Sequence, residues 1–283
     1  MPRKLKIFLI IIFFIIFIIF CVLYFNYNNN KFEVIFFNVG QGDSALINLP
    51  GNNEILIDGG PDKTVLYKLN KYLPVYNRDI ELMILTHPHA DHTTGLIEVL
   101  KRYNIKKIMY TGIKYDSEIY KEFINIINKK LASHSLGKGG NIKIIKPEDF
   151  DKIKLDDKNI LKIIYPRENL ENKNFSDLND SSIVFKLDTP EKDFLFTGDI
   201  TVAVEKEILN NINNNLLRAD ILKVAHQGSI TSSSEEFIKA VSPAFAVIPV
   251  GENNFGHPSL RVIRRLERLG AQILRTDQSD IAF

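Results

Sequence analysis

Three histidines and one aspartate fall within six residues, at positions 87–92, where the sequence is HPHADH. Imidazole and carboxylate groups are the ligands that Zn, Fe and Mn prefer in proteins. His87 and His89 lie two residues apart around a proline and can turn toward one ion. Asp91 and His92 lie further along the loop and can face a second ion. We therefore predict two adjacent divalent metal ions, Zn or Mn. The alternative interpretation, a polar surface loop, explains so dense a set of ligands less well.

A buried strand must carry this loop. Residues 82–85 are apolar and bounded on both sides, which predicts a strand that ends at Thr86 and places the ligands at its carboxyl end. Two more histidines, His226 and His257, follow later strands. The remaining one, His134, lies in a stretch rich in serine and glycine, and we predict that it is exposed to solvent.

Three aspartates follow predicted strands on glycine turns: Asp43, Asp58 and Asp199. The strands that flank or precede them cover residues 32–38, 44–49, 54–57, 182–187 and 193–196. Asp43 and Asp58 are candidates for carboxylates that orient a ligand histidine, with a purely structural turn as the alternative. Asp199 repeats the geometry of the metal loop and is a candidate bridging ligand.

The predicted strands come in two groups, and each group is followed by helices. The other strands are expected at residues 107–111, 142–145, 160–165, 220–225, 244–250 and 272–275. The helices are expected at residues 63–73, 93–103, 117–131, 201–209, 235–241 and 259–269. Two such groups predict an α/β fold in which sheet packs on sheet with helices outside.

Composition excludes several classes of protein. An apolar fraction of 45% over 283 residues is sufficient for a sizeable core, so the chain is neither disordered nor fibrous. The single cysteine, Cys21, excludes an intrachain disulfide. Without the three basic residues near the start, 33 basic and 34 acidic residues remain, a balance of −1. The folded part lacks the overall basic excess of a tight nucleic-acid binder. A local patch at residues 261–268, which contain four arginines, remains an alternative to a solvated helix face.

Residues 7–25 are nineteen consecutive residues without a charge, which is long enough to cross a bilayer as a helix. We predict that residues 1–30 form a membrane anchor and short linker, and that residues 31–283 form one hydrolase domain. Arg3, Lys4 and Lys6 precede the apolar run, and only Lys31 follows closely, so the positive-inside bias favours a cytoplasmic N-terminus. The expected location is the cell membrane, with the folded domain outside the cytoplasm.

Six segments resemble one family in the right order. They are VGQGDS (39–44), IDGG (57–60), HPHADH (87–92), TGD (197–199), KVAHQGS (223–229) and GHP (256–258). The sequence resembles the metallo-β-lactamase superfamily, specifically the hydrolase domain of ComEC-type competence proteins, over residues 32–283. The resemblance implies an αββα sandwich with a two-metal site at one edge, preceded here by the transmembrane helix.

The resemblance also implies roles for individual residues. His87 and His89 would hold the first metal, Asp91 and His92 the second, and Asp199 would bridge them. His226 is a further candidate ligand. His257 would either complete the second site or donate a proton, and we leave these alternatives open.

Three positions depart from the family pattern. A paired histidine of the family is Gln227 here, and the usual Thr-Gly-Gly after the metal loop is Thr-Thr-Gly at residues 93–95. Lactamases and glyoxalases supply a third histidine to the first metal where this chain has Leu-Asn-Asp-Ser at residues 178–181. Asn179 or Asp180 is a candidate oxygen ligand there, which would favour Mn over Zn.

The resemblance implies a metal-dependent hydrolase, and we predict a phosphodiesterase or nuclease that acts on DNA or a nucleotide and serves DNA uptake. Two neighbouring ions would activate a water and stabilise negative charge on a phosphoryl oxygen. Asp91 or Asp199 would steer the nucleophile, and His226 or His257 would stabilise the developing charge or protonate the leaving group. The alternatives are hydrolysis of a lactam, lactone or thioester, and a non-catalytic metal-stabilised partner of a membrane assembly. Transport of DNA would need a separate membrane channel, because a single span without a polar face cannot form one.

Overall fold

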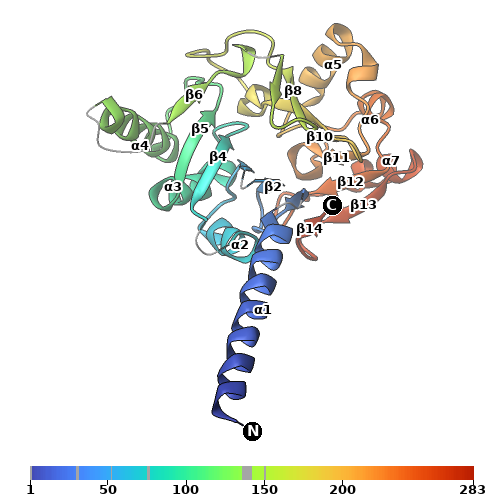
Figure 1. The fold of residues 1–283 in the computed structure, drawn as a ribbon. Coiled ribbons are helices and arrows are strands. Elements are labelled where there is room, and N and C mark those ends of the chain that lie inside the picture. The colour runs from blue at the N-terminus through green and yellow to red at the C-terminus, as the bar shows by residue number, and fades with distance from the viewer. Residues whose placement is uncertain (1, 30–31, 52, 75–76, 136–141, 150) are drawn as a thin grey trace.

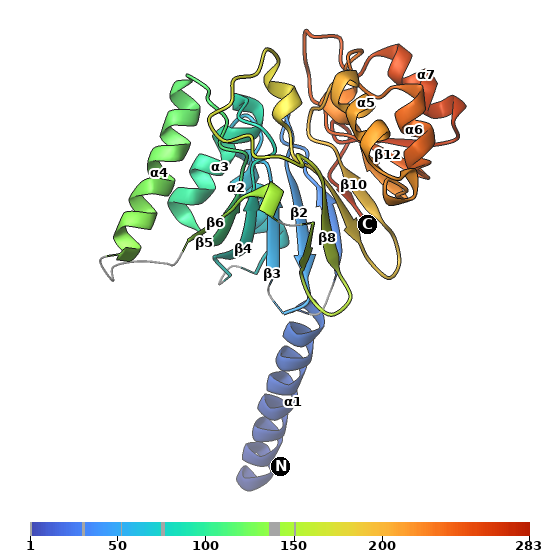
Figure 2. The same cartoon turned by 90° about the horizontal axis from the view of Figure 1, so that it is seen from above.

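The computed structural model describes residues 2–29, 32–51, 53–74, 77–135, 142–149 and 151–283. Two seven-stranded sheets pack face to face, and helices cover the outer face of each, which confirms the predicted αββα sandwich (Figures 1 and 2). The side chains of residues 21–29 and 133–135 lie outside the description, so the prediction for His134 concerns an undescribed side chain.

The first sheet has the strand order β14-β1-β2-β3-β4-β5-β6. Its strands are β1 (Glu33–Phe36), β2 (Ala45–Leu49), β3 (Asn53–Ile57), β4 (Asp79–Ile84), β5 (Asn104–Met109), β6 (Lys143–Ile145) and β14 (Ile281–Ala282). Strands β3 to β6 are parallel, so their carboxyl ends meet at one edge. Strand β2 is antiparallel to β3, and therefore its first residues lie at the same edge.

The second sheet has the order β13-β12-β11-β10-β9-β8-β7. Its strands are β7 (Lys152–Lys154), β8 (Ile160–Tyr165), β9 (Val184–Asp188), β10 (Phe194–Phe196), β11 (Ile221–Lys223), β12 (Phe245–Ile248) and β13 (Gln272–Arg275). Strands β10 to β13 are parallel, so the loops after β10, β11 and β12 also leave from one edge.

Three apolar layers hold the sandwich together. The central layer lies between the sheets and contains stacked aromatic rings, such as Phe185 and Phe196 at 4.8 Å between centroids. One outer layer packs helices α2 (Thr64–Tyr72), α3 (Ala90–Arg102) and α4 (Glu118–Ser135) on the first sheet. The other packs α5 (Val202–Asn211), α6 (Glu235–Val241) and α7 (Leu260–Arg268) on the second. Short 3₁₀ turns η1 (Pro147–Asp149), η2 (Leu178–Ser181), η3 (Asn214–Leu216) and η4 (Ala225–Gly228) complete the chain.

Helix α3 begins earlier than the sequence predicts. His89 is its extended N-cap residue, and the His89 carbonyl accepts hydrogen bonds from the amides of His92 and Thr93 at 3.1 and 3.0 Å. The expectation that Asp91 and His92 lie further along a loop is therefore wrong, because both occupy the first turn of the helix. A carboxylate is favourable at this position, where the helix dipole is positive.

Two short strands were not predicted. Strand β7 carries two lysines in three residues, and β14 exists only because the end of the chain pairs with β1, where Ile35 lies opposite Ala282. Neither pairing has a strong local signal, since each depends on a partner that is distant in the sequence.

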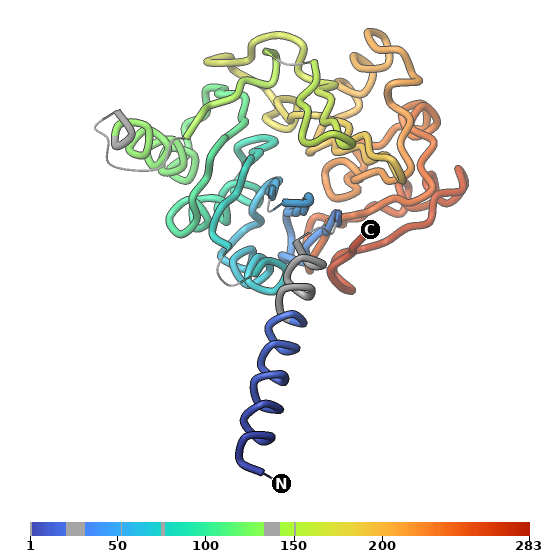
Figure 3. Tube along the Cα trace, in the orientation of Figure 1, coloured from blue at the N-terminus to red at the C-terminus, as the bar shows by residue number. Residues whose placement is uncertain are grey.

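Helix α1 (Arg3–Asn29) extends away from the sandwich in both views (Figures 1 and 2). The apolar side chains from Ile7 to Phe20, apart from the half-buried Ile12, are exposed, with values that reach 65% at Phe13. Among the residues that the structure describes, no helix meets the length and apolarity required to cross a bilayer, so the predicted span is not confirmed. Figure 3 traces the path of the chain from α1 into the two halves of the sandwich.

Candidate metal centre

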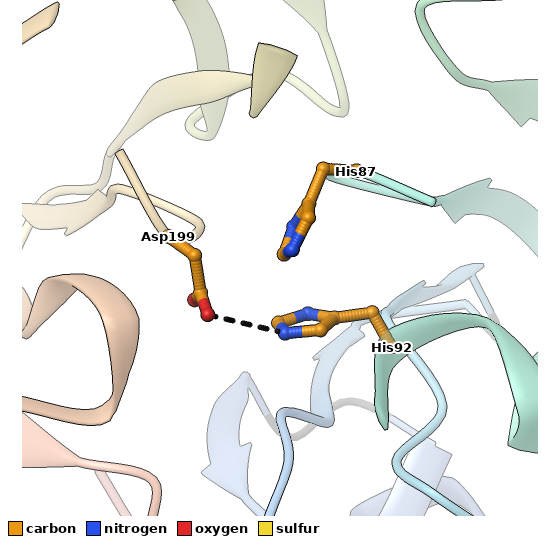
Figure 4. A group of neighbouring side chains, drawn as sticks. All are labelled: His87, His92 and Asp199. Carbon is orange, nitrogen blue, oxygen red and sulfur yellow. Dashed lines mark ion pairs between the residues drawn. The ribbon is translucent and has the colours of Figure 1, made fainter. Parts of the chain in front are cut away.

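His87, His92 and Asp199 meet at the edge where the two sheets approach each other (Figure 4). One ligand atom from each lies within 4.8 Å of the other two, and all three residues are buried. His92 Nε2 lies 3.4 Å from Asp199 Oδ2 and 3.6 Å from Asp91 Oδ2. Within the described part of the chain this nitrogen has no hydrogen-bond partner. A buried imidazole nitrogen that lies between two carboxylates without forming a hydrogen bond is suited to a cation.

His89 extends this group from the same loop. Its Nδ1 lies 3.0 Å from His87 Nε2, and the two rings are 4.8 Å apart at a steep angle. Burial lowers the pKa of His87 well below its usual value, and it also lowers the pKa of His89. Both imidazoles are therefore neutral at pH 7, which is the form that binds metal.

Asp58 orients His92 from the first sheet. Its Oδ2 accepts hydrogen bonds from His92 Nδ1 at 2.9 Å and from the Thr86 hydroxyl at 2.7 Å, while Oδ1 accepts from the Thr86 amide. This arrangement turns His92 Nε2 toward Asp199. Burial alone lowers the pKa of His92, but the carboxylates of Asp199, Asp91, Asp58 and Asp43 together raise it well above its usual value.

Lys223 joins the two sheets beneath this group. Its ammonium contacts Asp43 and lies 3.1 Å from Asp199 Oδ1, and it donates a 2.6 Å hydrogen bond to the Gly198 carbonyl. Burial alone would lower the pKa of Lys223, but the two carboxylates raise it above its usual value. Asp199 is held ionised, because Lys223 and His92 lower its pKa well below the usual range against the effect of burial. Burial raises the pKa of Asp43 to about 7, opposed by Lys223.

The backbone turn at Gly198 brings Asp199 into place. Gly198 has a φ of 51°, and a Cβ there would lie 2.6 Å from the Ser182 side chain. Gly95 in helix α3 also leaves no room for a side chain, since a Cβ would lie 1.8 Å from the Gly59 carbonyl oxygen. Glycine is therefore present at the two positions where a side chain would collide with a neighbour. Thr94, which departs from the family pattern, occupies a less crowded, half-buried position.

Gln227 contacts the metal loop from the second sheet. Its Nε2 donates a 2.7 Å hydrogen bond to Asp91 Oδ2, and its Oε1 accepts one from Gln41 Nε2. Gln41 in turn accepts a 3.0 Å hydrogen bond from the Gly251 amide. The amide that replaces a family histidine is thus fixed by a chain of hydrogen bonds and holds the Asp91 carboxylate.

His226 and His257 face each other at 5.4 Å between ring centroids. In the described residues, neither belongs to a group of three close ligand atoms. Burial and the charge of His226 lower the pKa of His257, while Asp199 and Asp91 act in the opposite direction. His257 Nδ1 is buried and has no hydrogen-bond partner in the described part of the chain. His226 has a φ of 50°, and its Nδ1 lies 3.5 Å from the Thr231 hydroxyl.

The two candidates for an oxygen ligand differ in their surroundings. Asp180 Oδ1 accepts hydrogen bonds from the Thr201 hydroxyl at 2.6 Å and from its amide at 3.2 Å, which ties it to the start of α5. Asn179 is buried, and its Oδ1 has no partner among the described residues. Of the two residues, Asn179 is therefore the one whose side-chain oxygen is available to bind a metal.

Sequence analysis assigned no role to Lys223 or Gln41. The signal for Lys223 was a single charge inside the apolar run at residues 221–225, and Gln41 stood between two glycines of a turn. Both become informative only when the opposite sheet is in place, because Lys223 contacts Asp43 and Gln41 contacts Gln227 across more than a hundred residues of sequence.

An αββα sandwich with histidines and carboxylates at the shared edge defines the metal-dependent hydrolase fold class. The model of the metallo-beta-lactamase superfamily matches residues 37–252, and the chain belongs to this superfamily. It is 29% identical over 266 residues to ComE operon protein 3 of Bacillus subtilis (strain 168), covering 87% of this chain and 32% of that protein. It is 28% identical over 255 residues to competence protein ComA of Neisseria gonorrhoeae, covering 88% of this chain and 32% of that protein.

These relatives confirm the ComEC-type branch, and the chain spans about a third of their length. A metallo hydrolase from Ignicoccus hospitalis, Igni18, has the same fold, with a TM-score of 0.52 at 15% identity over 89% of this chain and 98% of that chain.

Proposed function

We propose that this chain is a metal-dependent phosphodiesterase that cleaves DNA or a nucleotide. The observation that carries the proposal is the convergence of His87, His92 and Asp199, with His92 Nε2 lying between two carboxylates without a hydrogen bond in the described part of the chain. Its relatives are named as competence proteins and, in Haemophilus influenzae, as recombination protein 2, and these names favour a nucleic-acid substrate.

The donor set fits divalent ions. His87, His89 and Asn179 would hold the first ion, Asp91 and His92 would hold the second, and Asp199 would contribute to both. Imidazole and carboxylate ligands suit Zn or Mn, and an amide oxygen at Asn179 favours Mn. Such ions lower the pKa of a water molecule and stabilise charge on phosphoryl oxygens.

The side chains of the protein supply orientation and proton transfer. Asp91, held by Gln227, accepts a hydrogen bond from the attacking water and directs it at phosphorus. His257 is neutral at pH 7 because its pKa is lowered, so its ring N–H can donate a hydrogen bond to the leaving oxygen, which takes its proton from solvent. Lys223 keeps Asp199 ionised and fixed between the sheets.

We further propose that residues 1–30 anchor the enzyme in a membrane and that residues 31–283 form its catalytic domain outside the cytoplasm. The exposed apolar side chains of α1 and the basic residues before them support this arrangement. A reporter enzyme that is active only in the cytoplasm should stay inactive when fused to the C-terminus. Activity of that fusion would contradict the orientation.

Metal analysis of the full chain, purified in a mild detergent, tests the function together with a substrate screen. Bis-p-nitrophenyl phosphate, single-stranded DNA and nitrocefin would each be offered with added Mn or Zn. Cleavage of the phosphodiesters supports the proposal. Cleavage of nitrocefin alone would replace it with a lactam hydrolase, and bound metal without any hydrolysis would indicate a non-catalytic partner of a membrane assembly.

A further inference from the structure

A groove of about 650 Å³ lies between α7, α6 and the start of α5 on the outer face of the second sheet. Its basic side chains are those of Lys206, Arg261, Arg264, Arg265 and Arg268. Glu235 and Glu236 also line it, so five positive and two negative side chains leave a charge of +3. We call this feature the basic groove. The excess is local, because the chain after its first six residues carries a balance of −1.

The basic side chains of the groove fall into two groups. Arg265 donates to the Ser233 carbonyl, and Arg268 pairs with Glu235, so these two arginines connect α7 to α6. Arg261, Arg264 and Lys206 are exposed and form no ion pair with a carboxylate of the described residues. Three cations are therefore available to an external anion.

The spacing of the arginines suits a chain of phosphates. Residues three and four apart share one face of a helix, so Arg261, Arg264 and Arg268 form a stripe along α7, in which Arg268 is already paired with Glu235 and the first two arginines remain available. At about 1.5 Å of rise per residue, this stripe is roughly 10 Å long. The planar guanidinium group forms paired hydrogen bonds with phosphate oxygens.

The basic groove adjoins the loops of the candidate metal centre. Ile230, exposed at its wall, is followed by Thr231, which contacts His226. Helix α7 begins just after His257, and the amide of its cap residue Ser259 donates a 2.8 Å hydrogen bond to the Gly228 carbonyl. A polymer lying in the groove would therefore continue toward the histidine pair.

Phe255 adds an aromatic surface at this junction. Its side chain is 76% exposed, and its ring lies 5.9 Å from that of His257. A phenylalanine ring exposed to water does not stabilise the fold, but a base of an unpaired strand can stack on it. A stripe of arginines that leads to an exposed aromatic ring matches the phosphates and bases of single-stranded nucleic acid better than the headgroups of a lipid surface.

We propose that the basic groove binds the phosphate backbone of single-stranded nucleic acid and that Phe255 stacks on a base beside His257. The inference rests on the proposed phosphodiesterase function, for which it defines the substrate as a polymer. Arg261, Arg264 and Lys206 contact phosphates, and the strand runs from α7 to the metal centre.

Binding of a fluorescent oligothymidylate to the full chain in detergent, with EDTA present, tests the groove without catalysis. The double variant Arg261→Ala/Arg264→Ala should bind about ten-fold more weakly, and the slope of log affinity against log salt should fall by roughly 1.4. The variant Phe255→Ala should weaken binding without changing that slope. The matched control, Lys152→Ala/Lys158→Ala, removes two exposed lysines at or near β7, the opposite edge of the same sheet, and should bind like the parent.

Hydrolysis of bis-p-nitrophenyl phosphate keeps this test separate from the proposed function. The parent, the double arginine variant and the lysine control should hydrolyse this small ester equally, because it does not reach the groove. Oligothymidylate binding that is absent from the parent, or equal in the arginine variant and the control, overturns the inference. The inference is also overturned if the arginine variant loses binding to phosphatidylserine vesicles but keeps binding to oligothymidylate, because the groove would then be a lipid site. If the parent fails to hydrolyse the ester but the arginine variant loses oligothymidylate binding, the groove stands and the phosphodiesterase does not.

Discussion

The side-chain amide of Gln227 donates a 2.7 Å hydrogen bond to Asp91 Oδ2 across the edge of the two sheets. The two residues are separated by 136 positions in the sequence. Gln227 is buried, and its own oxygen accepts from Gln41, so the amide cannot turn away. The position that departs from the family pattern therefore restrains the carboxylate that we assign to the reacting water.

Replacement of Gln227 by leucine should lower kcat for bis-p-nitrophenyl phosphate by about 10- to 100-fold, as loss of a group that orients a ligand usually does. Leucine has a similar volume but cannot donate to Asp91. Gln41→Leu interrupts the same chain one bond further away and should lower kcat less. Steady-state kinetics measures both variants. Equal activity of Gln227→Leu and the parent would show that Asp91 needs no such partner.

Asp91→Asn should abolish hydrolysis, with a loss of at least about 10² in kcat. The amide keeps the shape of the carboxylate and can still accept from Gln227, but it lacks the charge that attracts a metal and a proton. Asp91 is partly exposed, so the fold should be unaffected. Circular dichroism and the thermal midpoint provide the control. A variant that is folded and fully active would refute the assignment.

Asp58→Asn should weaken metal binding by about 10- to 100-fold, because the charged acceptor that orients His92 is lost. Asparagine tolerates the left-handed backbone of Asp58, whose φ is 52°, so the backbone itself should not change. Asp62→Asn, on the exposed part of the same loop, is the matched control. Calorimetric titration with Mn or Zn measures both, and equal affinities would exclude a role for Asp58 in orienting the ligand.

Lys223→Met should destabilise the metal-free protein by about 3–5 kcal/mol, because Asp43 and Asp199 would remain buried without their cation. The double variant Asp43→Asn/Lys223→Met removes one of the two charges and should regain part of this loss. Denaturant unfolding in the presence of EDTA measures the free energy of unfolding of the parent and both variants. An unchanged midpoint for Lys223→Met would mean that the lysine does not neutralise this pair.

Glu54 provides a pH-dependent test far from the metal centre. It is buried, its Oε1 accepts a 2.6 Å hydrogen bond from Asn77, and its Oε2 has no partner among the described residues. Burial raises its pKa to about 7. The folded state thus binds more protons than the unfolded state between the ordinary pKa and pH 7, and stability falls as pH rises through this window.

Glu54→Gln removes the free-energy cost of a buried ionised carboxylate and keeps an oxygen that accepts the hydrogen bond from Asn77. The variant should have a higher thermal midpoint than the parent at pH 8 and a similar one near pH 4.5. Glu33→Gln on β1, which is separated from β3 by β2 in the same sheet, is the control at both pH values. A difference between Glu54→Gln and the parent that does not change with pH would contradict the raised pKa.

Sequence alone determined the features that depend on near neighbours. The apolar run before Thr86 and the dense ligands at residues 87–92 placed candidate ligands at the end of a strand. The glycine turns located Asp58 and Asp199, since a sharp reversal after a strand has a local signature. The two groups of strands and helices sufficed to predict the sandwich.

Tertiary structure decided which of these groups meet. Asp199 reaches His87 and His92 only because β10 and β4 end at the same edge of facing sheets. The same packing pairs Lys223 with Asp43 and Gln227 with Asp91, whereas His226 lies against His257. No local pattern encodes such contacts. They follow from the burial of the central apolar layer, which fixes how one sheet lies on the other.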